Sequence, residues 1–406
     1  MIAAATAPEL DLSHVDAVGG ALGVAVSGGG DSVALAVLLC RARPQRDITL
    51  LTVNHGLRPE AADECRFVAA LGATLGRRVE VLTADGPPVG SLQAWAREAR
   101  YTALAEAAAT LGLAAVATAH TADDQAETML LRLARGSGLK GLAAMRPDTT
   151  HHGLRILRPL LGTRRETLRV FLRERGIAWR EDPSNDDTRF DRIAMRALAP
   201  ELERAGLSTT RLAATATHLA RASDLVDTLA AELLARAARR RRTGATVIAP
   251  APWFAAHEEV RLRAFAEALR STGGLTHPPR FATLAAADAA LRRGEATTLG
   301  RCRAVPHGAS LALWREARGI EAIAVAPGGR GVFDGRYAVA LRASAPEVRV
   351  AAAGPAGRAW AARDEVGAAA ETMPAVFVAG ALVALPTLGV RRRDWPANAA
   401  IVRPLR

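Results

Sequence analysis

Short apolar runs alternate with longer stretches of helical spacing through the first third of the chain. Apolar runs bounded by glycine, proline or polar residues predict β-strands at 22–26, 48–53, 79–83 and 114–119. The stretches between and after them predict helices at 31–41, 61–75, 93–111 and 123–135. Strands separated by helices of this length indicate an α/β fold, in which helices cover both faces of a parallel sheet. Ligands gather beyond the carboxyl ends of the strands in such sheets.

The second half of the chain loses this alternation. A long pattern of alanine, leucine and arginine at 207–242 predicts one helix ending in the run Arg239–Arg242, and shorter helices are expected at 260–269 and 281–291. From about residue 304 the chain changes to short β-like runs, at 309–314, 320–325, 331–341, 348–352 and 376–385. We therefore predict three domains: an α/β domain at 1–205, a helical domain at 206–303 and a small β-rich domain at 304–406.

The positive charge of the chain is concentrated in its second half. The 406 residues carry a formal net charge of +12, with 53 basic and 41 acidic side chains. Residues 1–215 hold 26 basic and 25 acidic side chains, whereas residues 216–406 hold 27 and 16. A localised basic excess favours a polyanionic partner, although arginines solvated on helix faces would give the same count.

The cysteines and the apolar runs exclude several protein classes. Cys40, Cys65 and Cys302 lie far apart and form no CxxC pair, which argues against a disulfide scaffold and against a cysteine-bound metal or iron–sulfur site. No run of about 18 uninterrupted apolar residues is present, so no membrane helix is expected. The early residues do not resemble a signal peptide. We therefore expect a cytoplasmic protein without membrane association.

A glycine-rich loop directly follows the first predicted strand and opens a helix. It reads Ser27-Gly28-Gly29-Gly30-Asp31-Ser32. Glycines allow successive N–H groups to point at phosphate oxygens, and the helix N-terminus also attracts anions. Asp31 would serve as a ligand of Mg²⁺ that bridges phosphates. The loop lacks the lysine of a Walker P-loop, Val33 replaces the third glycine of a dinucleotide fingerprint, and Ala25 excludes a GxSxG nucleophile elbow.

An acidic cluster opens the helix after the fourth predicted strand. Asp123 and Glu127 are four residues apart and Asp124 and Glu127 three apart, so the carboxylates share one helix face. Beside a phosphate loop, such a face could receive a cationic substrate, hold Mg²⁺ or accept a proton. Taken alone, the same pattern would indicate only an acidic helix start with solvated charges.

Two histidines and two arginines are further candidates. His55 and His120 each follow a predicted strand, at the edge where ligands bind. Arg97 and Arg100 lie three apart on one predicted helix, where either could clamp a phosphate or stabilise charge in a transfer step. A structural histidine and a solvent-facing arginine pair are the alternative interpretations.

The loop resembles the SGGxDS motif of the PP-loop superfamily, whose members cleave ATP between the α and β phosphates. Further segments narrow the resemblance to the bacterial tRNA(Ile)-lysidine synthetases, over roughly residues 20–200. They are Val53-Asn54-His55-Gly56-Leu57-Arg58, Arg97-Glu98-Ala99-Arg100-Tyr101, Thr118–Thr128, Arg158-Pro159-Leu160-Leu161 and Glu181–Asp187. The chain departs from the family pattern at Thr121, where many members have a second histidine, and at Ile193, where an asparagine is usual.

The resemblance implies an enzyme that uses ATP and Mg²⁺ to attach free L-lysine to the wobble cytidine of an isoleucine tRNA with a CAU anticodon. The loop at 27–32 and His55 would bind ATP, with Asp31 holding Mg²⁺. Asp31, Arg97, Arg100, His120 and Asp124 would be catalytic. Asp123, Asp124 and Glu127 would bind lysine, and Arg189, Arg192 and Arg196 the tRNA.

Two alternatives and the assembly stay open. Another PP-loop enzyme, such as a tRNA cytidine thiolase, would share the loop, although the absence of CxxC pairs argues against it. A non-catalytic tRNA-binding protein would need neither the loop nor the acidic helix. A homodimer is among the assemblies expected, since the sequence does not determine the oligomeric state.

Overall fold

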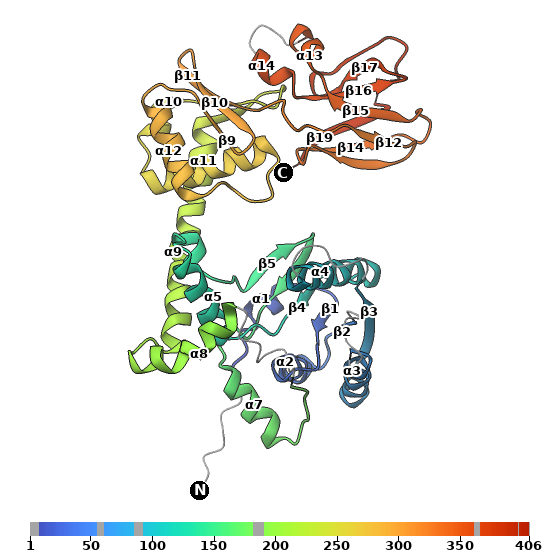
Figure 1. Cartoon of the computed structure of the whole chain (residues 1–406). Coiled ribbons are helices and arrows are strands. Elements are labelled where there is room, and N and C mark those ends of the chain that lie inside the picture. Colours follow the sequence, from blue (N-terminus) through green and yellow to red (C-terminus); the bar gives the residue numbers. More distant parts are fainter. Residues whose placement is uncertain are drawn as a thin grey trace. The chain divides into compact units, whose positions relative to one another are not determined.

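The computed structural model describes residues 8–54, 61–84, 92–181, 191–360, 366–396 and 398–405. The chain divides into two compact units, Met1–Ser223 and Asp224–Arg406, which we name the N-terminal and C-terminal units (Figure 1). The boundary falls within helix α9 (Thr209–Ala237). The predicted division into three domains remains a prediction.

A mostly parallel sheet forms the centre of the N-terminal unit. Its strands lie in the order β3-β2-β1-β4-β6-β5. The strand bounds are β1 (Leu22–Ala25), β2 (Ile48–Asn54), β3 (Arg78–Thr83), β4 (Ala115–Ala117), β5 (Asp148–His151) and β6 (Leu154–Leu157). All neighbours pair in parallel except β5 and β6, which form an antiparallel hairpin at one edge. The parallel sheet confirms the predicted fold class, whereas the hairpin was not predicted, because the Asp-Thr-Thr-His sequence of β5 has no apolar alternation.

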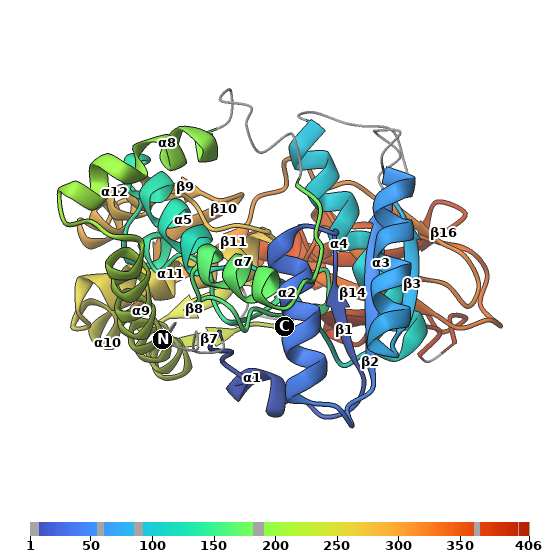
Figure 2. The same cartoon turned by 90° about the horizontal axis from the view of Figure 1, so that it is seen from below.

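Helices cover both faces of this sheet. Their bounds are α1 (Ser13–Asp16), α2 (Gly30–Ala42), α3 (Ala61–Leu75), α4 (Leu92–Leu111), α5 (Ala122–Ala134), α6 (Leu139–Leu142), α7 (Arg165–Glu174) and α8 (Asp191–Arg204). One core joins the strands to α2, α3 and α7 through residues such as Leu35, Val68 and Leu172. A second core joins the other face to α4 through Leu104 and Ile156. Figure 1 shows α4 on one side of the strands, and Figure 2 shows α2 and α3 in front of β1 and β2 on the other.

The C-terminal unit combines a helical part with antiparallel sheets. Helices α10 (Pro250–Phe254), α11 (Glu258–Gly273) and α12 (Phe281–Arg292) pack with a sheet in the order β7-β8-β11-β10-β9 around Trp253 and Phe265. The bounds are β7 (Ala238–Arg240), β8 (Thr246–Ile248), β9 (Thr297–Leu299), β10 (Cys302–His307) and β11 (Ser310–Arg315).

Later residues of this unit form two further sheets and two short helices. The sheets have the orders β12-β15-β16-β17-β18 and β13-β14-β19. The strand bounds are β12 (Ile323–Val325), β13 (Arg330–Phe333), β14 (Tyr337–Leu341), β15 (Val348–Ala352), β16 (Pro374–Val378), β17 (Ala381–Leu385), β18 (Val390–Arg391) and β19 (Ala400–Pro404). The helices are α13 (Pro355–Trp360) and α14 (Gly367–Ala370).

The predicted helix at 207–242 is wrong at its end. Helix α9 stops at Ala237, and Arg239 and Arg240 belong to β7, where they pair with Val247 and Thr246 of β8. A hairpin turn with Gly244 at φ +87° closes this pair. The arginine run therefore forms a sheet edge rather than a helix tail, because strand pairing across the turn outweighs the helical propensity of Ala and Arg.

A search for membrane-crossing helices gave none: no helix among the residues that the structure describes has the length and apolar character to cross a bilayer.

Candidate active site

The two sequence motifs meet because β1 and β4 are neighbouring parallel strands. Leu22 pairs with Ala115 and Val24 with Ala117, so the strands end at the same edge of the sheet. The sheet order reverses direction between β1 and β4, which makes this edge the topological switch point of the fold. The loop at 27–32 follows β1, and the segment from Thr118 to Asp124 follows β4.

The glycine-rich loop is held in shape by its own hydroxyls and by the segment after α7. The Ser32 hydroxyl donates to Gly29 O at 2.9 Å and accepts from Ser27 N at 3.2 Å. Gly28 has φ +89°, a conformation that other residues rarely adopt. The Arg180 N–H donates to Gly28 O at 2.9 Å. These bonds fix the loop where it leads into the N-terminus of α2.

Two glycines of the loop leave room that a side chain would fill. A Cβ on Gly30 would lie 3.3 Å from the Trp179 ring, and Gly29 caps α2 in an extended conformation. The amide groups of the loop and of the first turn of α2 therefore stay accessible to an anion. This arrangement fits the phosphates of a nucleotide, and nucleotide binding by these residues remains a prediction.

The start of α5 is fixed by a capping box. The Thr121 side chain accepts from Asp124 N, and the Asp124 Oδ2 atom accepts from both Thr121 N and Thr121 Oγ1 at 2.8 Å. Only Oδ1 of Asp124 is left to face a cation. The position where many family members have a second histidine thus holds a helix cap in this chain. His120 lies just before it, with Nδ1 3.0 Å from Thr118 Oγ1.

Arg165, at the start of α7, joins the loop to the acidic helix. Its guanidinium lies 2.8 Å from Asp31 Oδ2 through Nε and 3.1 Å from Asp124 Oδ1 through Nη2. A third contact, from Nη1 to Glu127 Oε1, measures 3.8 Å. The Arg165 backbone N–H donates to Asp123 Oδ2 at 2.8 Å. The Arg165 side chain therefore contacts Asp31, which was predicted to bind ATP and Mg²⁺, and Asp124 and Glu127, which were predicted to bind lysine.

Arg165 was missed by the sequence analysis. A basic residue in the first turn of a helix opposes the helix dipole, so it needs a specific anionic partner. The two arginines at 164–165, at the start of a helix, were the available signal in the sequence. They do not reveal which carboxylates pair with them. We define Asp31, Asp124, Glu127 and Arg165 as the carboxylate–arginine cluster.

The cluster sets the charge state of its members. Burial raises the pKa of Asp31 above its ordinary value, although Arg165 opposes this shift. Burial also acts to raise the pKa of Asp124, but Arg165, His120 and the Thr121 hydrogen bonds outweigh it and hold this pKa below its ordinary value. The pKa of Arg165 is raised: burial would lower it, but the surrounding carboxylates dominate. Arg165 therefore stays charged, and Asp124 stays ionised.

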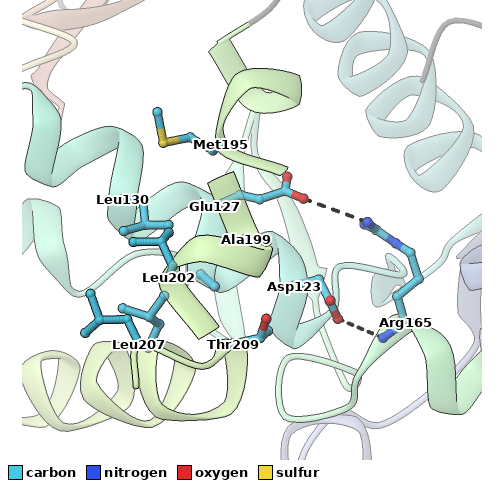
Figure 3. A pocket seen from close by; sticks show the side chains of 11 residues that line it. Asp123, Glu127, Leu130, Arg165, Met195, Ala199, Leu202, Leu207 and Thr209 are labelled. Carbon is cyan, nitrogen blue, oxygen red and sulfur yellow. Dashed lines mark hydrogen bonds and ion pairs between the residues drawn. The ribbon is translucent and has the colours of Figure 1, made fainter. Parts of the chain in front are cut away.

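A pocket opens beside the cluster, between α5, α7, α8 and the start of α9 (Figure 3). One end carries Asp123, Glu127 and Arg165, with both carboxylates directed toward Arg165. The rest of the lining is largely apolar and comprises Ala126, Leu130, Met195, Ala199, Leu202, Leu207, Thr209 and Leu212. The cavity has a volume of about 100 Å³ and is partly open to solvent. The pocket suits a ligand with a cationic end and an aliphatic chain.

Two of the remaining candidates lie on α4, and the others lie outside the described residues. Arg97 on α4 is exposed and stacks over the Tyr101 ring, 5.1 Å from its centroid. Arg100 is exposed on the same helix. His55 and Arg189 lie outside the described residues, as do the side chains of Arg192 and Arg196 on α8.

Comparisons with known proteins show the family to which the chain belongs. Residues 7–202 match the PP-loop domain family, which binds ATP. The chain is 40% identical to a tRNA(Ile)-lysidine synthase of Ruegeria pomeroyi over 93% of this chain and 90% of that protein. It is 39% identical to one of Mesorhizobium japonicum, over 94% of this chain and 86% of that protein. It is 37% identical to a third, of Rhizobium meliloti, over 84% of this chain and 77% of that protein. With this identity over nearly the full length of its relatives, and with an intact phosphate loop beside an acidic helix, the chain belongs to the tRNA(Ile)-lysidine synthase family.

Proposed function

We propose that this enzyme converts the wobble cytidine of a CAU-anticodon tRNA(Ile) to lysidine in two steps. The C2 oxygen of the base attacks the α-phosphorus of ATP, and pyrophosphate leaves. The amine of free lysine then attacks C2, the bond between C2 and its oxygen breaks, and AMP leaves. An unpaired anticodon base is accessible to this chemistry without melting a duplex.

The observation that carries the proposal is the carboxylate–arginine cluster, which joins the phosphate loop to the acidic helix. Asp31 and Asp124 bind the same guanidinium at 2.8 and 3.1 Å, so a nucleotide on the loop lies next to a ligand held by α5. Two-step transfer requires this proximity, because the adenylated base must stay in place while the amine attacks it.

ATP would be held by the residues of the loop. The amides at 28–30 and the Ser27 hydroxyl offer donors to the phosphates, and the Ser32 hydroxyl supports the loop through its bond to Gly29 O. A side chain at Gly30 would intrude on Trp179. Asp31 offers carboxylate oxygens of the kind that Mg²⁺ prefers. When bound there, Mg²⁺ would neutralise charge on the phosphates. In the absence of these ligands Arg165 supplies the positive charge that Asp31 faces.

Lysine would occupy the pocket beside α5. Its ammonium or amine groups would lie at the end formed by Asp123 and Glu127, and its methylene chain would lie against Leu130, Met195 and Leu202. Glu127 is the candidate for the ammonium, because it lines the pocket and its side chain is nearly buried there. The side chain of Glu127 is 8% exposed, so its charge is poorly screened by water.

The tRNA would bind through basic residues outside the cluster. Residues 216–406 hold 27 basic against 16 acidic side chains, and a polyanion is the partner that such an excess favours. We assign the anticodon-side contacts to Arg189, Arg192 and Arg196, which follow one another at helical spacing, and the tRNA body to the 206–303 and 304–406 regions. A cytoplasmic location follows from the tRNA substrate. The homodimer remains a prediction.

One assay separates this function from its alternatives. The enzyme is incubated with ATP, Mg²⁺, labelled lysine and two tRNA(Ile) transcripts that differ only in cytidine or uridine at the wobble position. We expect label in the cytidine transcript alone, with pyrophosphate and AMP formed in equal amounts and steady turnover requiring lysine. A thiolase would incorporate no lysine, and a non-catalytic binding protein would retard the transcript in a gel without releasing pyrophosphate. Either result would refute the proposal.

Replacing Gly28 with alanine should weaken ATP binding. A side chain at φ +89° costs about 1–2 kcal/mol of strain, which the loop can relieve only by turning its amides away from the phosphates. We expect the KM for ATP to rise about 10-fold, measured as pyrophosphate release at saturating tRNA and lysine. Gly76→Ala is the matched control, because Gly76 has φ +62° and open space around it. An equal rise in both variants would contradict a phosphate-binding role.

Replacing Arg165 with alanine should shift the pH dependence of activity. The guanidinium favours the ionised form of Asp31, so its removal raises further a pKa that burial already raises. Because Mg²⁺ binds the ionised carboxylate, we expect the acidic limb of kcat/KM for ATP to move to higher pH. Arg173→Ala removes an exposed arginine from the same helix and should leave the limb in place. If Arg165→Ala left the acidic limb in place, Arg165 would not control the ionisation of Asp31 that activity requires.

A further inference from the structure

We propose that Glu98, His151 and His152 form a binding site for a divalent transition-metal ion of the Zn²⁺ class, separate from the ATP site. Glu98 comes from α4, His151 ends β5, and His152 lies in the turn that leads to β6. Their ligand atoms all lie within 4.8 Å of one another.

The three side chains already converge on one point. His152 Nε2 lies 2.9 Å from Glu98 Oε2, and His151 Nε2 lies 3.7 Å from Glu98 Oε1. With metal–nitrogen and metal–oxygen bonds of about 2.0–2.1 Å, the ligand atoms of a tetrahedral zinc ion lie about 3.3 Å apart. Small side-chain rotations would therefore bring all three donors to bonding distance.

The hairpin turn is what brings two adjacent histidines together. Neighbouring residues of a strand point to opposite faces, but His152 has φ +49° and Gly153 φ +76°, the left-handed pair of a two-residue hairpin turn. The two rings consequently lie side by side, with centroids 4.3 Å apart. The His151 ring also makes a T-shaped contact with the Tyr101 ring of α4, and this contact orients His151.

One nitrogen of the His151 ring is buried without a hydrogen bond. Among the described residues, His151 Nε2 has no hydrogen-bond partner, although it is shielded from solvent. Buried polar atoms without partners are rare and usually mark an unassigned water or ion. A neutral imidazole offers a lone pair at such a nitrogen to a metal ion.

The donor set selects the type of metal. Two imidazoles and one carboxylate suit Zn²⁺, Co²⁺, Ni²⁺ or Cu²⁺ rather than the all-oxygen preference of Mg²⁺ or Ca²⁺. Glu98 and His152 are more than a third exposed, which leaves the remaining coordination positions to water.

The proposed metal site lies away from the phosphate loop and connects helix α4 to the β5–β6 hairpin of the sheet. Strand β6 runs parallel to β4, and β4 parallel to β1, so the turn before β6 is at the edge opposite the loop that follows β1. A bound ion would attach α4 to the β5–β6 hairpin. We therefore expect metal binding to stabilise the N-terminal unit without competing with ATP.

The test is a competition titration of Zn²⁺ between the full chain and a chromophoric chelator, with magnesium present. We expect one equivalent bound with a micromolar or lower Kd, and a loss of at least about 10-fold in affinity in Glu98→Gln and in His152→Ala. Zn²⁺ should also raise the Tm of the wild-type chain and not that of the variants. His307→Ala, which removes a histidine of the C-terminal unit, is the matched control and should bind as the wild type does.

Three outcomes would overturn the proposal. The first is a wild-type chain that binds no Zn²⁺ below about 100 μM. The second is a His151→Ala, His152→Ala double variant that keeps wild-type affinity, which would place the ion elsewhere, for example on the cysteines. The third is a Zn²⁺ effect on Tm that is equal in the wild-type chain and in the variants. Circular dichroism of each variant checks that it is folded, and Glu98→Gln, the most conservative change, decides the result if a histidine variant does not fold.

Discussion

Replacing Asp31 with asparagine is expected to lower kcat for tRNA-dependent pyrophosphate release by at least about 100-fold. The change keeps the size of the side chain and removes the charge that would hold Mg²⁺ at the phosphates. Asp31 is partly buried and its Oδ2 lies 2.8 Å from Arg165 Nε, so water screens the effect of the lost charge only weakly. The measurement is single-turnover release of pyrophosphate from labelled ATP, which isolates the adenylation step from the later attack by lysine.

Asp16→Asn provides the matched control for this experiment. Asp16 forms an exposed ion pair with Arg43 in the same unit, and exposed pairs contribute little to stability or function. We expect this variant to release pyrophosphate at the wild-type rate. If Asp31→Asn did the same, the magnesium role of Asp31 and the assignment of the loop would both be wrong.

Replacing Glu127 with glutamine is expected to raise the KM for lysine by about 10–100-fold while adenylation continues. A hydrogen bond to a charged group contributes about 1.5–3 kcal/mol, and the buried position of Glu127 preserves most of that contribution. The loss should therefore appear in the lysine step, measured as labelled lysine incorporated at varied lysine concentration. The burst of pyrophosphate in the absence of lysine should stay close to that of the wild type.

The control for Glu127 is Glu166→Gln on α7. Glu166 pairs with Arg173 at the surface, where 62% of its side chain is exposed, so its neutralisation should leave the KM for lysine unchanged. A Glu127→Gln enzyme with an unchanged KM for lysine would move the lysine site away from the pocket of Figure 3. A loss of the adenylation burst would instead show that Glu127 serves the first step.

Much of the N-terminal fold was predictable because its signals are local. The predicted helix at 61–75 coincides with α3, and the predicted strand at 48–53 differs from β2 by one residue. Apolar periodicity and glycine turns act over a few neighbouring residues, so the sequence contains them in full. The β5–β6 hairpin lacks this signal, since its strands are defined by pairing with each other and with β4.

The C-terminal unit shows which details local signals leave open. The β-like runs predicted at 331–341 and 376–385 each contain two strands joined by a turn. The turns lie at Asp334–Arg336 and Ala379–Gly380, where positive φ values reverse the chain. Such a reversal depends on which strands pair across it, and pairing is a property of the folded unit.

By itself, the sequence determined the α/β alternation, the phosphate loop after the first strand and the acidic turn after the fourth, because each depends on residues close together in the chain. Only the tertiary structure decided that Arg165 joins them, for it lies 134 residues from Asp31 and 41 from Asp124. The same holds for Glu98 and His152, which are 54 residues apart. Charged and metal-binding groups act through space, so their partners become known only when the sheet order and the helix packing place them at contact distance.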